Sequence, residues 1–421
     1  MAGVFASPEA LTSVQIYSLP GPNLPYDFTR EGANAAFNAL TTTGDPTVTT
    51  ITSPANYISG MATGPYRGLV LGFDNKLYSA PWAADAGILV IDSATDTASI
   101  QSFGVSGLGI NGGKFTTGCL APNGKIYFPP FNHDKILVID PSNGTSYYLS
   151  QTFSTPSYST AVLGANGKIY CLGKNNCLII NPANDTLTTT SFGGIVPSNS
   201  TSDYYWLSGV RCLVDDKLYF VGQGQNYLIV IDTTTGANGT AVRNNFGLDN
   251  MRVRGLRYGG IANGQDGLLH LTPYTPTSSI YGPVKKFYGY IQPIGGSSAE
   301  QELVGININL TNIGAVNGDD GGVYSIPYAV GITSGVYVYN RIGFNNAQYG
   351  SFNISIPADR RWFGGCLAPN GKIYSLPDMG YSYISLTLGK AILVTNTAGT
   401  GRTITNFRNL IDTSYFNKGG T

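Results

Sequence analysis

The stretch Gly118-Cys-Leu-Ala-Pro-Asn-Gly-Lys-Ile-Tyr127 returns unchanged as Gly365-Cys-Leu-Ala-Pro-Asn-Gly-Lys-Ile-Tyr374. Weaker copies of the same unit occur before and between these two stretches. Units of 43 to 54 residues indicate a repeat architecture in which neighbouring supersecondary structures bury a shared core. Aligned on the lysine of the unit, the seven anchors are Lys76, Lys125, Lys168, Lys217, Leu268, Gly322 and Lys372.

The second unit shows what each repeat is expected to form. Asn123-Gly124 favours a tight hairpin turn, and Lys125-Ile-Tyr-Phe-Pro-Pro130 follows it as a return strand. Ile136-Leu-Val-Ile-Asp140 is apolar on both faces, which is typical of a strand buried between two sheets. Thr145-Ser-Tyr-Tyr-Leu-Ser150 alternates like a half-exposed outer strand. Each unit is therefore predicted to be a four-stranded antiparallel meander.

Radial packing of such meanders predicts an all-β fold, a β-propeller of seven four-stranded antiparallel blades. Closure of the ring removes exposed sheet edges. The alternative, a linear β-solenoid, normally has a shorter repeat and parallel coils. The third strands should be buried between blades, notably at Val138, Ile180 and Val230. The repeat tyrosines should occupy equivalent second-strand positions: Tyr78, Tyr127, Tyr170, Tyr219 and Tyr374.

The ends of the chain allow two interpretations. Residues 1–65 are expected to be an N-terminal anchoring segment or a degenerate extra blade, because Val14-Gln-Ile-Tyr-Ser-Leu-Pro20 echoes the repeat. The second interpretation would make eight blades, and seven are favoured. Residues 66–407 are assigned to the propeller and residues 408–421 to a C-terminal tail.

The composition limits the kinds of partner. Lys plus Arg and Asp plus Glu both number 24, so the chain has no net charge to attract a nucleic acid or an anionic membrane. No apolar stretch approaches the ~20 residues of a membrane helix, and Met1-Ala-Gly-Val-Phe-Ala-Ser lacks the features of a signal peptide. We therefore expect synthesis in the cytoplasm, and reduced buried thiols for the five cysteines.

Catalytic patterns are scarce in this sequence. It has two histidines, His133 and His270, and His270 replaces the repeat tyrosine, which indicates a core position. No spacing typical of zinc ligands occurs. Asp319-Asp320 falls at a predicted turn, where turn chemistry explains both carboxylates. We expect no catalytic residues, no metal and no cofactor, and therefore no enzymatic activity.

Aromatic residues beside polar ones form the candidate recognition surface, because an aromatic ring stacks on a sugar while polar neighbours bond its hydroxyls. Loops on a rigid scaffold are common places for such binding. The residues predicted to take part in surface recognition are Tyr204, Tyr205, Trp206, Arg361, Trp362, Tyr381 and Tyr383.

The Leu-Ala-Pro-Asn-Gly-Lys-Ile-Tyr unit followed by Ile-Leu-Val-Ile-Asp-Pro resembles a propeller repeat of tailed-bacteriophage and large-DNA-virus proteins, also present in some bacterial proteins. The resemblance covers residues 66–407 and implies a non-enzymatic virion structural protein, a tail, fibre or capsid-decoration component made in the host cytoplasm. Its expected partners are other virion proteins, through the N-terminal segment, and host-surface glycans, without nucleic acid or membrane insertion. The alternatives are a metal-dependent enzyme resembling streptogramin lyases or gluconolactonases, and an intracellular protein-interaction scaffold.

Overall fold

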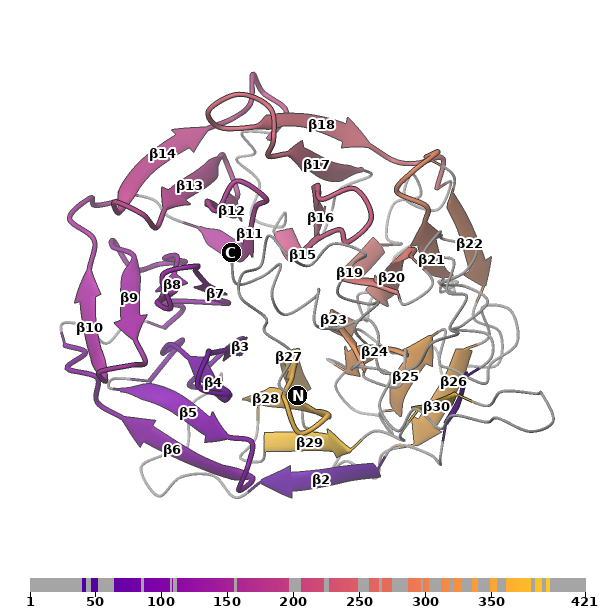
Figure 1. The fold of residues 1–421 in the computed structure, drawn as a ribbon, viewed down its shortest axis with the longest axis horizontal. Coiled ribbons are helices and arrows are strands. Elements are labelled where there is room, and N and C mark those ends of the chain that lie inside the picture. The colour runs from indigo at the N-terminus through magenta and orange to yellow at the C-terminus, as the bar shows by residue number, and fades with distance from the viewer. Residues whose placement is uncertain are drawn as a thin grey trace, which may run out of the picture.

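Seven four-stranded antiparallel sheets stand around one axis in the computed structural model of the protein (Figure 1). No α-helix occurs in the part of the chain that the structure describes. The described residues are 40–42, 47–51, 64–84, 87–106, 108, 112–154, 157–196, 206–222, 227–248, 257–264, 267–274, 287–296, 298–302, 312–318, 322–327, 335–339, 349–353, 361–379, 383–387 and 391–393.

The first four blades follow one another along the chain, each running from an inner to an outer strand. Their strands are β3 (Val70–Leu71), β4 (Lys76–Ser79), β5 (Ile88–Asp92) and β6 (Thr97–Gln101) in blade 1; β7 (Cys119–Leu120), β8 (Ile126–Phe128), β9 (Leu137–Asp140) and β10 (Thr145–Tyr148) in blade 2; β11 (Tyr158–Leu163), β12 (Ile169–Gly173), β13 (Cys177–Asn181) and β14 (Thr186–Thr190) in blade 3; and β15 (Trp206–Arg211), β16 (Leu218–Gly222), β17 (Leu228–Asp232) and β18 (Thr240–Asn244) in blade 4.

Blades 5 and 6 keep this order although their sequences diverge most from the repeat. Their strands are β19 (Arg257–Asn263), β20 (Leu269–Tyr274), β21 (Phe287–Ile291) and β22 (Ser298–Glu302) in blade 5, and β23 (Asn312–Asn317), β24 (Val323–Pro327), β25 (Gly335–Tyr339) and β26 (Tyr349–Asn353) in blade 6. The predicted all-β propeller of seven four-stranded blades is confirmed.

Blade 7 joins the two ends of the chain. Its three inner strands are β27 (Arg361–Leu367), β28 (Lys372–Met379) and β29 (Tyr383–Thr387), and its outer strand is β2 (Thr47–Ile51). Figure 1 shows β2 in indigo beside the yellow β29, and the two pair antiparallel from Thr47↔Thr387 to Ile51↔Tyr383. Nearby in sequence, β1 (Leu40–Thr42) pairs with β30 (Ala391–Leu393).

This closure corrects the expected start of the propeller, and the favoured count of seven blades is confirmed. The ring begins by Thr47 and not at residue 66, and β2 completes the seventh sheet, so it belongs to no eighth blade. The sequence did not reveal the closure because a strand pairing between the two ends of a chain has no local signal. Residues 1–39 and the predicted tail of residues 408–421 lie outside the described residues.

The repeat tyrosines share one position, as predicted. Tyr78, Tyr127 and Tyr170 each lie in the second strand of a blade and pair with one first-strand and one third-strand residue. Tyr219 and Tyr374 have the same register in blades 4 and 7. The divergent blades fill the position with His270 and Tyr324.

The core lies between neighbouring blades. Val138 and Ile180 are fully buried, and Val230 is 6% exposed. Side chains of blades 2 and 3 form one such cluster, which includes Tyr127, Val138 and Ile180. Because third strands bury both faces against neighbours, no single blade could keep this apolar surface from water.

In each regular blade, the Asp or Asn side chain of the first turn makes two kinds of hydrogen bond. The Asp or Asn side chain accepts a hydrogen bond from the backbone N–H of the lysine two residues later, as Asp74 does from Lys76 at 3.3 Å. The same side chain also bonds the repeat tyrosine, as in the 2.7 Å bond that Tyr78 donates to Asp74. This bonding explains why the turn and the tyrosine recur together. Equivalent pairs are Asn123 with Tyr127, Asn166 with Tyr170, Asp215 with Tyr219 and Asn370 with Tyr374.

Polar bonds then connect one blade to the next. Where the turn residue is Asn, the tyrosine hydroxyl donates to the outer turn of the following blade: Tyr127 to Asp185 at 2.7 Å and Tyr374 to Asp96 at 2.5 Å. The second of these bonds joins blade 7 to blade 1, where Lys372 also pairs with Asp96. The ring is thus closed by side chains as well as by β2.

Candidate binding site at the ring axis

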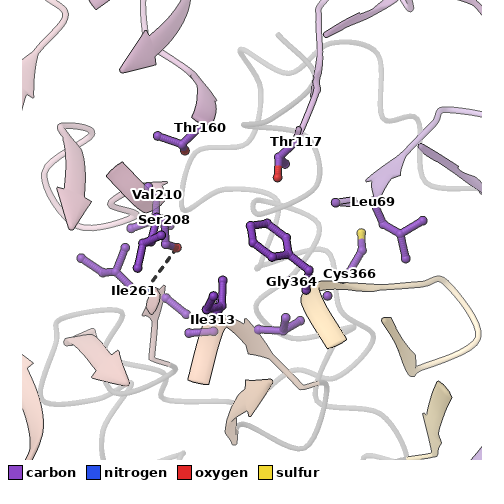
Figure 2. A pocket seen from close by; sticks show the side chains of 18 of the residues that line it. Leu69, Thr117, Thr160, Ser208, Val210, Ile261, Ile313, Gly364 and Cys366 are labelled. Atoms are coloured by element: carbon purple, nitrogen blue, oxygen red, sulfur yellow. Dashed lines mark hydrogen bonds between the residues drawn. The ribbon is translucent and has the colours of Figure 1, made fainter. Parts of the chain in front are cut away.

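A cavity of about 270 Å³ lies where the innermost strands converge. Its walls come from all seven blades, from Gly68 and Leu69 before β3 to Phe363–Leu367 in β27. Figure 2 shows these side chains gathered around the axis. A concave space formed by a rigid scaffold is the default place to look for a ligand.

One register position, two residues before the first-strand partner of the repeat tyrosine, is repeated around this cavity. Three consecutive blades carry a hydroxyl there: Thr117 in blade 2, Thr160 in blade 3 and Ser208 in blade 4. The other four blades carry Gly68, Gly260, Gly314 and Gly364.

Close packing of the inner strands explains the glycines. A Cβ on Gly260 would lie 2.4 Å from the carbonyl carbon of Gly314, and a Cβ on Gly314 would lie 3.0 Å from Cα of Gly364. The inner strands of blades 5 and 6 therefore lie too close to their neighbours for a side chain at this position, whereas Gly364 in blade 7 is favoured by its positive φ of 62°. Side chains are accommodated in blades 2 to 4, which makes the cavity wall chemically asymmetric.

The hydroxyls differ in how they are bonded. Ser208 Oγ accepts a 3.3 Å hydrogen bond from the N–H of Ile261, drawn as a dashed line in Figure 2. Thr160 is only 5% exposed, yet its hydroxyl bonds to no other described residue. Figure 2 shows the Thr117 and Thr160 oxygens directed toward the open space.

The rest of the wall is apolar or uncharged. Ile261, Ile313 and Val316 lie in blades 5 and 6, and Phe363 lies in blade 7. The Arg67 guanidinium stacks between Trp82 and Phe363, 3.8 Å and 5.0 Å from their ring centroids. Among the described residues that line the cavity, none is Asp, Glu, His, Lys or Arg.

Cys366 is the lining residue with a thiol, and it is half-buried. It occupies the register position of Cys119, as the sequence predicted, because each pairs with the repeat tyrosine of its blade. Burial raises the pKa of Cys119 to about 12 and raises that of Cys171 well above its ordinary value. Cys177 and Cys212 are also buried, and all five thiols are free, so Cys171 and Cys177 form no bridge across their hairpin.

The two tryptophans expected at the surface are buried. Trp206 begins β15 and is 2% exposed, with its ring 6.4 Å from that of Tyr227. Trp362 lies in β27 and is 1% exposed. Neither indole can stack on a surface sugar, so the expectation of exposed loop aromatics is wrong at these positions. Trp206 belongs to the core cluster between blades 3 and 4, where the burial of a large ring stabilises the packing.

The other predicted recognition residues are not brought together in the described structure. Arg361 is the first residue of β27, and Tyr383 is the first residue of β29, where it pairs with Ile51. Both are therefore in strands and not in loops. Tyr204, Tyr205 and Tyr381 lie outside the described residues, as do Asp319 and Asp320.

The two histidines have different surroundings: His270 is buried, and His133 is half-buried between β8 and β9. His270 is 1% exposed and shares a hydrogen bond with Tyr288, which confirms its role as a substitute for the repeat tyrosine. The His133 ring stacks on that of Tyr148 with 5.1 Å between the ring centroids. Its Nδ1 accepts a 3.1 Å hydrogen bond from the Lys135 N–H. Neither histidine lines the axial cavity.

Neither a cluster of metal-ligand residues nor a membrane-spanning helix occurs in the described ranges. No three side chains of the His, Cys, Asp or Glu type come together there as potential metal ligands. No helix in the same ranges has the length and apolar character needed to cross a membrane.

Solved structures with the same arrangement include known propellers. Virginiamycin B lyase from Staphylococcus aureus matches with a TM-score of 0.60 and 15% identity over 82% of this chain and 100% of that chain. YCF48 from Cyanidioschyzon merolae matches with a TM-score of 0.53 and 9% identity over 82% and 99%. Identities this low show the fold alone. No protein-family model matches the chain, and no curated protein sequence matches it significantly.

Thr117, Thr160 and Ser208 were not among the residues predicted from the sequence to take part in recognition. A signal exists, because Thr117 and Thr160 each stand ten residues before a repeat tyrosine, where Gly68, Gly314 and Gly364 stand in other units. Ser208 escapes this count, because the first turn of blade 4 is one residue longer. Only the strand register places it with the two threonines.

Proposed function

We propose that the chain is a non-enzymatic structural and recognition component of a virion, in which the propeller is a rigid body for assembly. The observation that carries the non-enzymatic part is the wall of the axial cavity. The described residues that line it are glycines and residues with aliphatic, aromatic, amide, hydroxyl or thiol side chains. Acid, base and metal chemistry need groups such as His or carboxylates, which ionise or coordinate near neutral pH.

A rigid body is supported by the seam between the first and last blades. A strand from one end of the chain, β2, completes the sheet formed by the other end. The hydrogen bond from Tyr374 to Asp96 and the ion pair of Lys372 with Asp96 add to this closure. A ring closed in this way can hold its loops in fixed positions, which suits a component of a particle.

The virion assignment itself rests on the resemblance of the repeat unit to viral propeller proteins. The expected partners are neighbouring virion proteins, reached through the N-terminal residues, together with glycans of the host surface. Membrane insertion and nucleic-acid binding form no part of the proposal, and no cofactor is invoked.

The test is the location of the protein after infection or induction of the host. Gradient-purified particles should contain the chain in fixed stoichiometry by mass spectrometry, and antibodies against it should label particles in electron micrographs. A protein that stays in the soluble lysate while particles form without it would refute the proposal and favour the intracellular interaction scaffold.

A metal-dependent lyase or lactonase is the second candidate. It is favoured by the fold similarity to virginiamycin B lyase, which extends over the whole of that chain. Its test is turnover of a streptogramin B antibiotic or a sugar lactone with and without added divalent cations. Metal-dependent turnover by the purified chain would establish this candidate and overturn the non-enzymatic proposal.

A further inference from the structure

We infer that the axial cavity is a binding site for a neutral monosaccharide, held by the hydroxyl arc formed by Thr117, Thr160 and Ser208. The inference rests on the recognition part of the proposed function and moves the site from the predicted surface aromatics to the ring axis. It is carried by the register position that these three residues share and by the partnerless hydroxyl of Thr160.

The hydroxyl arc is a departure from the repeat. At the same register position the other four blades carry glycine, which shows that the fold needs no polar group there. Three neighbouring blades nevertheless present hydroxyls to one side of the same space (Figure 2).

Thr160 supplies the independent sign of a ligand. The residue is 5% exposed, lines the cavity, and makes no side-chain hydrogen bond to any described residue. Figure 2 shows its oxygen directed toward the open space, where the hydroxyl can both donate and accept. A ligand hydroxyl that enters the cavity can therefore bond Thr160 directly.

The wall chemistry selects a neutral ligand with many hydroxyls. A Ser or Thr hydroxyl both donates and accepts, which matches the hydroxyls of a sugar. No lysine or arginine among the described lining residues would offset an anion, and no carboxylate would offset a cation. Charged sugars such as uronic acids and amino sugars would therefore lose hydration without gaining an ion pair.

The opposite side of the cavity provides an apolar surface. Phe363 belongs to blade 7, which faces blades 3 and 4 across the axis in Figure 1. The Arg67 guanidinium lies over its ring, 5.0 Å from the ring centroid. A pyranose has an apolar C–H face and a polar hydroxyl edge, and this cavity offers a surface for each.

The volume limits the ligand to one ring. The cavity holds about 270 Å³, slightly below the ~300–1,000 Å³ of ordinary small-molecule sites. A single sugar, or the terminal sugar of a glycan, suits this space better than an extended oligosaccharide.

The test is saturation-transfer NMR and calorimetry of the full chain with glucose, galactose, mannose and N-acetylglucosamine, and with glucuronate and glucosamine as charged probes. We expect at least one neutral sugar to bind and the charged probes to bind more weakly. Thr117→Val and Thr160→Val keep the shape and remove the hydroxyl, so each should weaken binding about fivefold, the equivalent of one hydrogen bond.

Thr188→Val is the matched control, because Thr188 is exposed on the outer strand β14. It should leave the affinity unchanged, and the melting temperatures of all three variants should match the parent. Bound sugar should also slow alkylation of Cys366, which lines the cavity. The inference is overturned if no neutral sugar binds, if a charged probe binds as tightly, or if Thr188→Val has the effect of the cavity variants. Absence of binding overturns it even when the protein is found in particles, where the assembly role would stand.

Discussion

Ile51→Ala should destabilise the ring much more than Thr49→Ala, although both residues lie in the five-residue strand β2. Ile51 is 7% exposed and belongs to the core cluster between blades 7 and 1, with Tyr66, Leu77 and Tyr374. Thr49 is exposed on the same strand. Comparing the two variants therefore separates the packing between blades 7 and 1 from the mere presence of strand β2.

The magnitude follows from what the substitution removes. Ile→Ala deletes three carbon groups, worth ~0.8 kcal/mol each in transfer from water, or about 2.4 kcal/mol. A cavity at a site that cannot collapse adds a further cost, which brings buried Ile→Ala changes to about 2–5 kcal/mol. Since Ile51 ends its strand and its surroundings can relax in part, we expect about 3 kcal/mol. Thr49→Ala should cost less than about 0.5 kcal/mol, as surface changes do.

The assay is equilibrium urea unfolding followed by tryptophan fluorescence, which reports on the buried Trp82, Trp206 and Trp362. A lower midpoint for Ile51→Ala with an unchanged slope would show a loss of stability without a change in the unfolding unit. Equal midpoints for the two variants would refute the reasoning, because β2 would then be a peripheral tail whose removal the ring tolerates.

Other predictions test the blade contacts, the seam and the cavity thiol. Val230→Asp should yield no soluble folded protein, because Val230 is 6% exposed and an unpaired buried charge costs several kcal/mol. The control is Val242→Asp, which should fold and melt like the parent, because the cross-strand partner Val242 is 54% exposed. Tyr374→Phe should lower stability by about 1–2 kcal/mol in urea titrations, since it removes a hydrogen bond to a partly exposed carboxylate. Burial opposes ionisation of Asp96, but its bonds to Lys372 and Tyr374 outweigh burial and lower its pKa. The stability that Asp96 adds is therefore present above the ordinary carboxyl pKa of ~4 and is lost as the pH falls through the lowered pKa. A loss of stability in Tyr374→Phe that is the same at pH 7 and pH 2 would contradict this prediction. Cys366 should be the first described thiol to react with a disulfide reagent in the native protein, as peptide mapping would show, and faster labelling of a buried cysteine would contradict the burial.

Particular residues show how far sequence reasoning reached. The Asn-Gly turns, the recurring tyrosines and the apolar third strands are local signals, and they predicted the blades and their number correctly. Buried and exposed aromatics carry no such signal, because the same residue types serve both. Trp206 and Trp362 were therefore assigned to a surface, although they pack in the core.

What the sequence by itself determined is the repeating unit: its period, its turn chemistry and the strand order within each blade. These follow from contacts between residues close in the chain, such as Asp74 with Tyr78. Only the tertiary structure decided that β2 closes blade 7, because that pairing joins Thr47–Ile51 to the far end of the chain. Only the register of the paired strands aligned Ser208 with Thr117 and Thr160 across a turn of different length. The ring and its axial cavity exist only when all seven blades meet, so the chemistry of that cavity depends on contacts that no single repeat contains.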